Sequence, residues 1–215
     1  MTFRRKRWVF KLSGSLDNEK ILSRLIPVID ELSSKLRVVI VPGGGAFADF
    51  IRARSARRKT SEKTAHAQAV MSTGQFGYEL AERFKNGIAV YNRSQVTAAF
   101  KSGATPVFIP HPFAVDQKRI PATWEATSDT IAVETCRYLR IGGLVMLKSV
   151  DGIYKNGKLQ AQAGKASLKK SGVVDPVFGG RLEPGWDVFI LNGRKPQRLK
   201  QLLETGSTIM TKIRC

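Results

Sequence analysis

The sequence predicts an α/β protein, a three-layer αβα sandwich around a mainly parallel, open sheet. Short apolar segments alternate with amphipathic segments along the whole 215-residue chain, and this alternation is typical of parallel sheets with helices on both faces. Several apolar segments, such as 38–41, are β-branched throughout, as in strands that are buried on both sides. No internal repeat or low-complexity linker divides the chain, so residues 1–215 are interpreted as a single domain.

The first part of the chain contains four of the predicted strands. Asp17 or Asn18 is expected to cap the first helix, because apolar residues from Ile21 to Leu32 recur after it at helical spacing. Residues 55–64 are basic, polar and without periodicity, and they are predicted to form a loop. Strands are expected at 8–12, 38–41, 88–91 and 106–110, further helices at 46–54, 65–84 and 94–102, and irregular structure at 111–124.

The second part of the chain continues the alternation. A helix is predicted to begin at Ser128 and Asp129 and to reach about residue 138. It is followed by a buried strand at 143–148. The expected C-terminal elements are a strand at 187–191, a helix at 195–204 and a last strand at 208–210.

The charge of the chain is strongly positive, with 36 Lys and Arg against 17 Asp and Glu and a formal net charge of +19. Basic surfaces attract polyanions. However, few aromatic residues are interleaved with the basic groups, so base-stacking platforms are not indicated. Nucleic-acid binding is therefore not favoured, and a small-molecule substrate is expected.

The sequence indicates neither a membrane protein nor a secreted one. No segment approaches the roughly 18 consecutive apolar residues that a membrane span needs, and Lys11 interrupts the apolar run near the N-terminus that could resemble a signal peptide. Cys136 and Cys215 provide no disulfide framework and no metal-ligand spacing. A cytoplasmic, reduced protein is expected, with no metal site built from its own side chains.

Three turns of small residues follow predicted strands, at 13–15, 43–45 and 149–152. Ligands of open parallel sheets bind at the carboxyl ends of the strands. Glycine lets the backbone approach a phosphate closely, and the N-terminus of a following helix offers free N–H groups. The turns therefore predict a phosphate site, although neither glycine turn matches the P-loop or the dinucleotide-binding pattern.

Two charged residues stand beside these turns. Lys11 lies in an otherwise apolar strand, where burial is costly without an anionic partner. Its ammonium group can reach the surface, or it can meet a phosphate of ATP. Asp129 begins a helix and can act as a cap there, and a capping carboxylate can also orient a lysine or the shell of a magnesium ion.

Together these motifs resemble the amino acid kinase superfamily, which includes acetylglutamate, glutamate, aspartate and uridylate kinases. Residues 11–15 (KLSGS) resemble its K-x-G-G-S opening, and residues 41–45 (VPGGG) its second glycine loop. Residues 127–132 (TSDTIA) are similar to its aspartate motif, and residues 147–154 (LKSVDGIY) to its nucleotide-site motif. Residues 206–209 (GSTI) stand in place of the usual G-T-x-I. The motifs occur in the family's order and cover nearly the whole chain.

A finer resemblance is to a subgroup of methanofuran-biosynthesis kinases that act on 5-(aminomethyl)-3-furanmethanol phosphate. It rests on residues 42–49 (PGGGAFAD), on Pro121 and Trp124 before the aspartate motif, and on a set of helix and C-terminal residues. That set is His66, Ala69, Met71, Gln75, Asn192, Gly193, Pro196, Arg198 and Leu199.

The resemblance implies roles for individual residues. Lys11 and Asp129 are expected to be catalytic, with ATP and Mg²⁺ as cofactors. His66 can be an ordinary packed residue or a ligand of the acceptor. Trp124 can be an ordinary core residue or a side chain that stacks on a furan ring. The expected groups are phosphate-binding Ser13, Gly14 and Ser15; acceptor-binding Gly43, Gly44, Gly45, His66, Thr127 and Ser128; and nucleotide-binding Lys148, Ser149, Asp151, Gly152 and Tyr154.

One departure from the family pattern concerns a second catalytic lysine. Many members carry it in a G-G-M-x-x-K stretch, whereas residues 177–182 (VFGGRL) contain no lysine at that spacing. Arg181 or Lys148 is a candidate to supply the charge, or the site lacks it.

The predicted function is an ATP-dependent small-molecule kinase that acts on a phosphorylated furan alcohol, in a homo-oligomer. Two alternatives stay open. The acceptor can be an amino acid carboxylate or a nucleoside monophosphate, because one fold serves many acceptors. The chain can also be a nucleotide- or oxyanion-binding protein of this fold without turnover.

Overall fold

The computed structural model of the protein describes residues 6–111, 113–116 and 120–215. Eight strands form one sheet, and within the described residues all neighbouring strands are parallel except one antiparallel pair near its end. In spatial order they are β3 (Gly87–Val90), β4 (Thr105–Phe108), β2 (Arg37–Pro42), β1 (Arg7–Leu12), β5 (Gly143–Lys148), β9 (Asp187–Asn192), β10 (Thr211–Arg214) and β8 (Gln162–Gly164). The antiparallel pair is β9 and β10.

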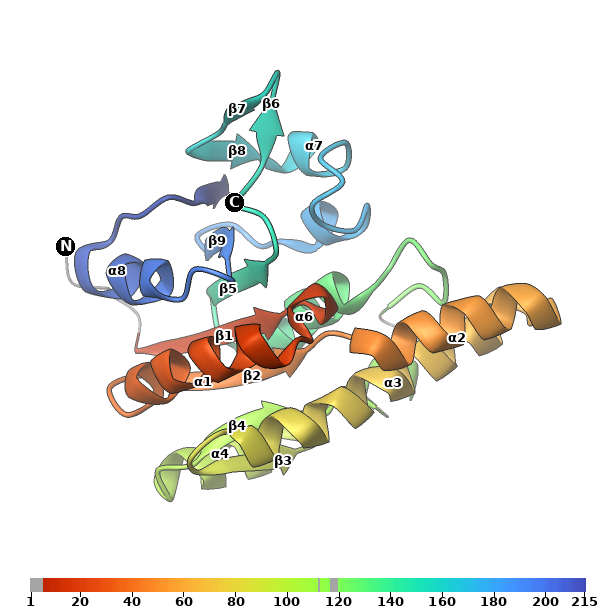
Figure 1. The fold of residues 1–215 in the computed structure, drawn as a ribbon, viewed down its shortest axis with the longest axis horizontal. Coiled ribbons are helices and arrows are strands. Elements are labelled where there is room, and N and C mark those ends of the chain that lie inside the picture. Colours follow the sequence, from red (N-terminus) through yellow and green to blue (C-terminus); the bar gives the residue numbers. More distant parts are fainter. Residues whose placement is uncertain (1–5, 112, 117–119) are drawn as a thin grey trace.

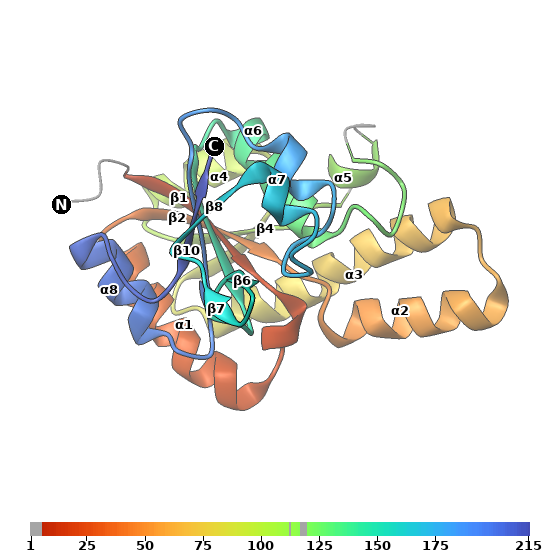
Figure 2. The ribbon, with the colours of Figure 1, turned by 90° about the horizontal axis from the view of Figure 1, so that it is seen from above.

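Helices cover both faces of this sheet (Figure 1, Figure 2). They are α1 (Glu19–Ser33), α2 (Gly45–Arg58), α3 (Glu62–Arg83), α4 (Arg93–Lys101), α5 (Phe113–Asp116), α6 (Ser128–Leu139), α7 (Lys165–Leu168) and α8 (Gln197–Thr205), with 3₁₀ turns η1 (Gly14–Leu16) and η2 (Phe178–Arg181). α1, α3 and α8 share one core cluster with Phe10, and α4 and α6 share the other with Val9. The expected three-layer αβα fold with a mainly parallel sheet is confirmed.

Alternation along the central strands decides which helices each side chain meets. Successive side chains of a strand point to opposite faces. Phe10 and Leu12 belong to the core cluster under α1, α3 and α8, whereas Val9 belongs to the cluster under α6. Lys11 therefore points to the α6 side. Met146 belongs to that same cluster, so Lys148, two residues further along β5, points to the same side.

The loop predicted at 55–64 is wrong. α2 continues to Arg58, Lys59 closes it in a left-handed conformation with φ 49°, and α3 begins at Glu62 after a Ser61 cap whose side chain accepts from the Thr64 N–H. Among α2 residues, only Gly45 and Ser55 are buried, so the helix has no apolar stripe from which periodicity could identify it. The α2–α3 pair extends away from the sheet in Figure 2.

The end of the chain also differs from the prediction. The last strand is Thr211–Arg214, not 208–210, and its buried and exposed residues alternate as it pairs with β9. The prediction missed the hairpin of β6 (Tyr154–Lys155) and β7 (Lys158–Leu159), as well as β8 and α7. It also missed α5, which lies inside the segment expected to be irregular, while residues 112 and 117–119 of that segment lie outside the described residues.

Two further sequence questions have structural answers. Asn18, not Asp17, caps α1, because its side chain accepts from the Lys20 N–H. Both cysteines are free thiols, and burial raises the pKa of the fully buried Cys136 far above its usual value, which keeps that thiol protonated. None of the helices described in this structure has the length and apolar character of a membrane span.

Candidate active site

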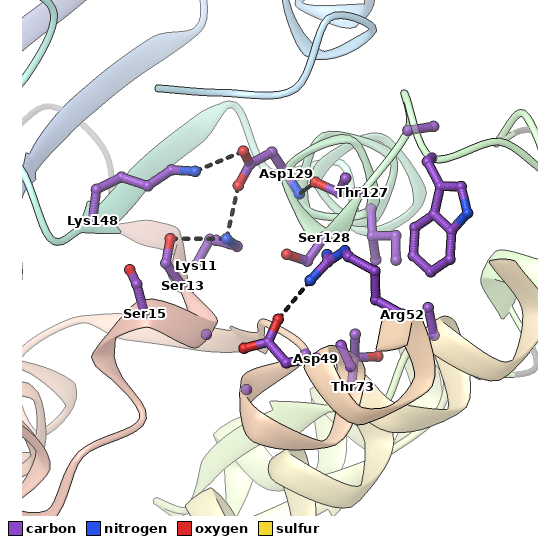
Figure 3. A pocket seen from close by; sticks show the side chains of 18 of the residues that line it. Lys11, Ser13, Ser15, Asp49, Arg52, Thr73, Thr127, Ser128, Asp129 and Lys148 are labelled. Carbon is purple, nitrogen blue, oxygen red and sulfur yellow. Dashed lines mark hydrogen bonds and ion pairs between the residues drawn. The ribbon is translucent and has the colours of Figure 1, made fainter. Parts of the chain in front are cut away.

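A cavity of about 470 Å³ opens at the carboxyl ends of β1, β2 and β5. Most of the residues that the sequence nominated as a site line it, and Figure 3 gives a close view. Those that line it are Lys11, Ser13, Gly14, Ser15, Gly44, Gly45, His66, Thr127, Ser128, Asp129, Lys148 and Ser149. Gly43, Asp151, Gly152 and Tyr154 do not.

Two lysines share one carboxylate at the inner end of this cavity (Figure 3). Lys11 Nζ lies 2.7 Å from Asp129 Oδ1, and Lys148 Nζ lies 2.6 Å from Asp129 Oδ2. The Lys11 ammonium also donates to Ser13 Oγ over 2.9 Å. Side-chain exposure is only 3%, 5% and 12% for Lys11, Asp129 and Lys148. We call these three residues the lysine–aspartate triad.

Burial and neighbouring charge shift the pKa values of the triad. Burial lowers the pKa of Lys11 to about 8, and the charge of Lys148 acts in the same direction, whereas Asp129 opposes both. For Asp129, burial pushes the pKa upward, but the charges and hydrogen bonds of both lysines outweigh it and hold the pKa well below its usual value. The triad therefore carries an excess of positive charge, which an anion entering the cavity would balance.

Asp175 holds the triad in position, and sequence reasoning missed it. Its carboxylate accepts from the N–H and hydroxyl groups of both Thr127 and Thr130 at 2.7–2.9 Å. Its own backbone N–H donates to Asp129 Oδ2 over 3.2 Å. Asp175 thus ties the start of α6 to the loop before η2. It stands in an irregular segment 46 residues from Asp129, where no local pattern marks it.

The two glycine turns pack directly against one another. A side-chain carbon on Gly14 would lie 2.5 Å from the Gly45 nitrogen, and one on Gly43 would lie 2.4 Å from the Gly14 nitrogen. Gly45 also adopts φ 55°, where glycine is favoured. Asp17, which the sequence offered as a cap for α1, instead accepts from the Ala46 N–H at the start of α2. These turns need glycine because no side chain fits between them.

The residues expected at the nucleotide have separate positions. Asp151 accepts from Asn192 Nδ2 over 2.7 Å and pairs with Arg198 at 2.7 Å. Gly152 adopts φ 151°, and a side chain there would meet Thr211 Oγ1 at 2.3 Å. Tyr154 is half exposed on β6. A nucleotide role for these residues stays a prediction, and Asp151 and Gly152 have structural roles in addition.

The outer end of the cavity is formed by α2, α3 and the segment before α6. The side chains of Asp49 and Arg52 form an ion pair at 2.5 Å and are largely exposed. The Arg52 guanidinium lies 5.3 Å from the centre of the Trp124 ring. His66 is buried and lines the cavity, and its Nδ1 contacts the Thr123 carbonyl over 3.1 Å.

The two candidates for the second cation lie in different places. Lys148 belongs to the triad, whereas the Arg181 guanidinium pairs with Glu134 at 3.3 Å and does not line the cavity. Of the two candidates, Lys148 therefore lies in the cavity beside Asp129 and Arg181 lies outside it.

The side chains present do not form a metal cage. No group of three or more His, Cys, Asp or Glu residues suited to a metal occurs in the described part of the chain. Asp129, the buried carboxylate of the cavity, is already paired with two lysines. Magnesium commonly binds through one or two carboxylates plus substrate phosphates, so these residues fit an ion that a nucleotide's phosphates carry into the site.

Comparison with known proteins agrees with this geometry. The family model described as "Amino acid kinase family" matches residues 6–166. The chain is 26% identical over 212 residues to [5-(aminomethyl)furan-3-yl]methyl phosphate kinase of Methanocaldococcus jannaschii. The aligned segment covers 95% of this chain and 96% of that protein.

Solved structures share the fold. The UMP kinase of Ureaplasma parvum superposes with a TM-score of 0.76 at 19% identity over 99% of this chain and all of that one. Uridylate kinase of Archaeoglobus fulgidus superposes with a TM-score of 0.73 at 16% identity, over 96% of this chain and 99% of that one. At these identities the likeness supports the fold alone.

Proposed function

Because the chain belongs to the amino acid kinase family, we propose that it transfers the γ-phosphoryl group of ATP to a small phosphorylated acceptor. The observation that carries the proposal is the lysine–aspartate triad at the carboxyl ends of β1 and β5. Phosphoryl transfer needs little covalent chemistry from the protein and depends on positioning and charge neutralisation. Two buried ammonium groups held by one carboxylate suit that task.

In the proposed reaction, an oxygen of the acceptor's phosphate attacks the γ-phosphorus of ATP. A bond forms between them as the bond from the γ-phosphorus to the β–γ bridging oxygen breaks, and ADP leaves with that electron pair. Lys11 and Lys148 neutralise charge on the transferring group. Asp129 holds both lysines, and the backbone N–H groups of Gly14, Ser15, Gly44 and Gly45 bind phosphate oxygens, whereas those of Ser13 and Gly43 already donate to the carbonyls of Leu147 and Leu12. Magnesium bound by the nucleotide would supply further charge neutralisation.

We propose [5-(aminomethyl)furan-3-yl]methyl phosphate as the acceptor, as in methanofuran biosynthesis. The relative from M. jannaschii is named for this activity and matches over nearly its whole length. The cavity volume of about 470 Å³ lies within the range of small-molecule sites. The Trp124 indole at its outer end offers an aromatic surface of the kind that a furan ring can pack against.

We also propose that the chain acts as a cytoplasmic homo-oligomer. Large apolar side chains are exposed on neighbouring elements: Tyr78 on α3 is 50% exposed, Ile88 on the edge strand β3 is 48% exposed, and Tyr91 follows at 37%. Exposed apolar residues that gather at one place favour association. Light scattering of the whole protein measures its mass in solution, and the Ile88→Lys variant is compared with the wild type. A monomeric wild type would contradict the homo-oligomer.

The experiment that tests the function is ATP turnover with magnesium against four acceptors: the furan phosphate, uridylate, acetylglutamate and glutamate. ADP formation that depends on the furan compound, and that falls at least about 100-fold in Lys11→Ala, is expected. Lys35→Ala is the matched control, because this lysine follows the end of α1, is exposed on the surface and forms its ion pair with Glu31 of that helix.

Two other results would overturn parts of the proposal. Turnover with another acceptor would keep the kinase and replace the substrate. ATP binding without ADP formation in a single-turnover experiment would indicate a nucleotide-binding protein that lacks catalysis.

A further inference from the structure

His66 presents an unpaired hydrogen-bonding atom at the acceptor end of the cavity. The side chain comes from α3, is 6% exposed and lines the cavity. Its Nε2 has no hydrogen-bond partner in residues 6–111, 113–116 and 120–215. A buried polar atom without a partner is destabilising, so its retention next to a ligand cavity indicates that a ligand supplies the partner.

The other ring nitrogen determines what that partner must be. Nδ1 lies 3.1 Å from the Thr123 carbonyl oxygen. A carbonyl oxygen can only accept, so Nδ1 carries the hydrogen and donates it. Burial lowers the pKa of His66, and this outweighs the opposing effects of Thr123 and Glu62. The neutral ring is therefore favoured near pH 7, and its Nε2 offers a lone pair, which requires a donor.

The charges around His66 favour a cationic donor. Glu62 lies one turn earlier on α3 and accepts from the Trp124 N–H over 2.9 Å. Asp49 of α2 also lines the cavity, and its ion pair with Arg52 offsets the one cation that α2 contributes there. At this end, the carboxylate and guanidinium of Asp49 and Arg52 line the cavity and Glu62 adds a second carboxylate close to His66, whereas the inner end holds two lysines and one carboxylate.

We propose that the acceptor is a phosphorylated primary amine whose amine N–H donates to Nε2 of His66, while its phosphate faces the lysine–aspartate triad. This rests on the proposed function and deepens it, because it identifies the feature by which the site selects its acceptor. Acceptors that present no hydrogen-bond donor at this position leave Nε2 unpaired and are disfavoured.

The test compares two ligands by calorimetric titration of the whole protein. One is [5-(aminomethyl)furan-3-yl]methyl phosphate, and the other is the same compound with a methyl group in place of the aminomethyl group. The wild type should bind the amine about tenfold more tightly than the methyl compound. His66→Phe should reduce that ratio to about one, and His66→Gln, which retains an acceptor oxygen, should restore part of it.

Matched controls separate recognition from folding. The other histidine of the chain, His111, does not line the cavity, so His111→Phe should keep the wild-type ratio. ATP affinity should be unchanged in all variants. If His66→Phe fails to fold, His66→Gln and the pH dependence of the wild type decide the matter.

The pH dependence is a readout that a purely structural role would not produce. Once pH falls below the pKa of His66, which burial lowers from the ordinary value of histidine, the ring is protonated and Nε2 can no longer accept, so the amine-to-methyl ratio should fall there. Both ligands share the phosphate, so its titration cancels in the ratio. The charged groups nearest to His66 on the packed helices are Glu62, one turn earlier on α3, and Asp49 and Arg52 of α2, which line the cavity with it.

A wild-type ratio near one, or an unchanged ratio in His66→Phe, overturns the inference while leaving the kinase proposal intact. Binding of neither ligand, with ATP still bound, overturns the proposed acceptor and this inference with it.

Discussion

The two ends of the cavity are built in different ways. At the inner end, Lys11 and Lys148 come from adjacent parallel strands in the middle of the sheet, and their charges meet Asp129 in a buried triad. At the outer end, Asp49 and Arg52 come from α2, which is largely exposed, and their ion pair lies at the surface. In the proposed function, the inner end provides fixed charge for chemistry, and the outer end provides a surface for recognition.

Different forces keep the two ends in place. β1 is paired along both edges, with β2 and with β5, so its backbone cannot shift independently. α2 has few buried residues and packs mainly against α3. Local unfolding of a region with few buried contacts costs less free energy than unfolding of the core. Substitutions at the inner end should therefore change both stability and catalysis, and those at the outer end should change acceptor binding.

The largest expected effect is that of Asp129→Asn. Removing the carboxylate takes away the charge that contacts both buried ammonium groups, which should lower the free energy of unfolding by about 3–5 kcal/mol and kcat by about 1,000-fold. Urea denaturation and ATP turnover measure the two effects. Asp49→Asn is the control, because its exposed pair with Arg52 should contribute less than about 1 kcal/mol. Equal effects of both variants on stability would contradict the contrast between the two ends.

A second comparison concerns Lys148→Met and Arg181→Met. Lys148 contacts Asp129, whereas Arg181 pairs with Glu134 outside the cavity. Steady-state kinetics should show kcat lower by about 100-fold in Lys148→Met and by about twofold or less in Arg181→Met. The reverse order would make Arg181 the second catalytic cation.

A smaller effect is expected from Gly14→Ala. The added carbon would lie 2.5 Å from the Gly45 nitrogen, so the two turns must separate, and KM for ATP should rise about tenfold. Gly164→Ala is the control, because nothing lies within 4 Å of its added carbon. Unchanged KM in Gly14→Ala would mean that the turns do not bind phosphate.

The smallest expected effect concerns pH. The pKa of Lys11 is about 8, so the lysine of the free enzyme loses its charge as pH rises through that value. The kcat/KM for ATP should be about half its maximum at pH 8 and should fall further above it. The fall in kcat should occur at higher pH, because bound phosphates stabilise the ammonium. A profile of kcat/KM that is flat to about pH 10 would contradict the buried position of Lys11.

Local patterns in the sequence were sufficient for the central strands and for the turns that follow them. A buried parallel strand appears as a continuous apolar run, and a close approach of two backbones appears as glycine. Lys11 was identifiable because a charge inside an apolar run is unusual, and Asp129 because it begins a helix. The resemblance to the amino acid kinase superfamily, which the family match confirms, rests on these same residues.

Other features depended on contacts between distant segments. Residues 55–58 are helical because α2 packs against α3. Since α2 buries few residues, its sequence shows no helical periodicity of apolar residues. Asp175 binds α6 from an irregular segment, and Asp17 binds the start of α2 instead of capping α1.

The sequence by itself determined the αβα fold class, the position of the glycine turns and the presence of a lysine and an aspartate beside them, because each depends on neighbours along the chain. The tertiary structure decided that Lys148 joins Lys11 on Asp129 and that Arg181 does not, and it leaves Nε2 of His66 without a partner among the residues it describes. The physical reason is that charge pairing and hydrogen bonding act over a few ångströms in space, and a linear sequence does not specify which distant side chains come that close.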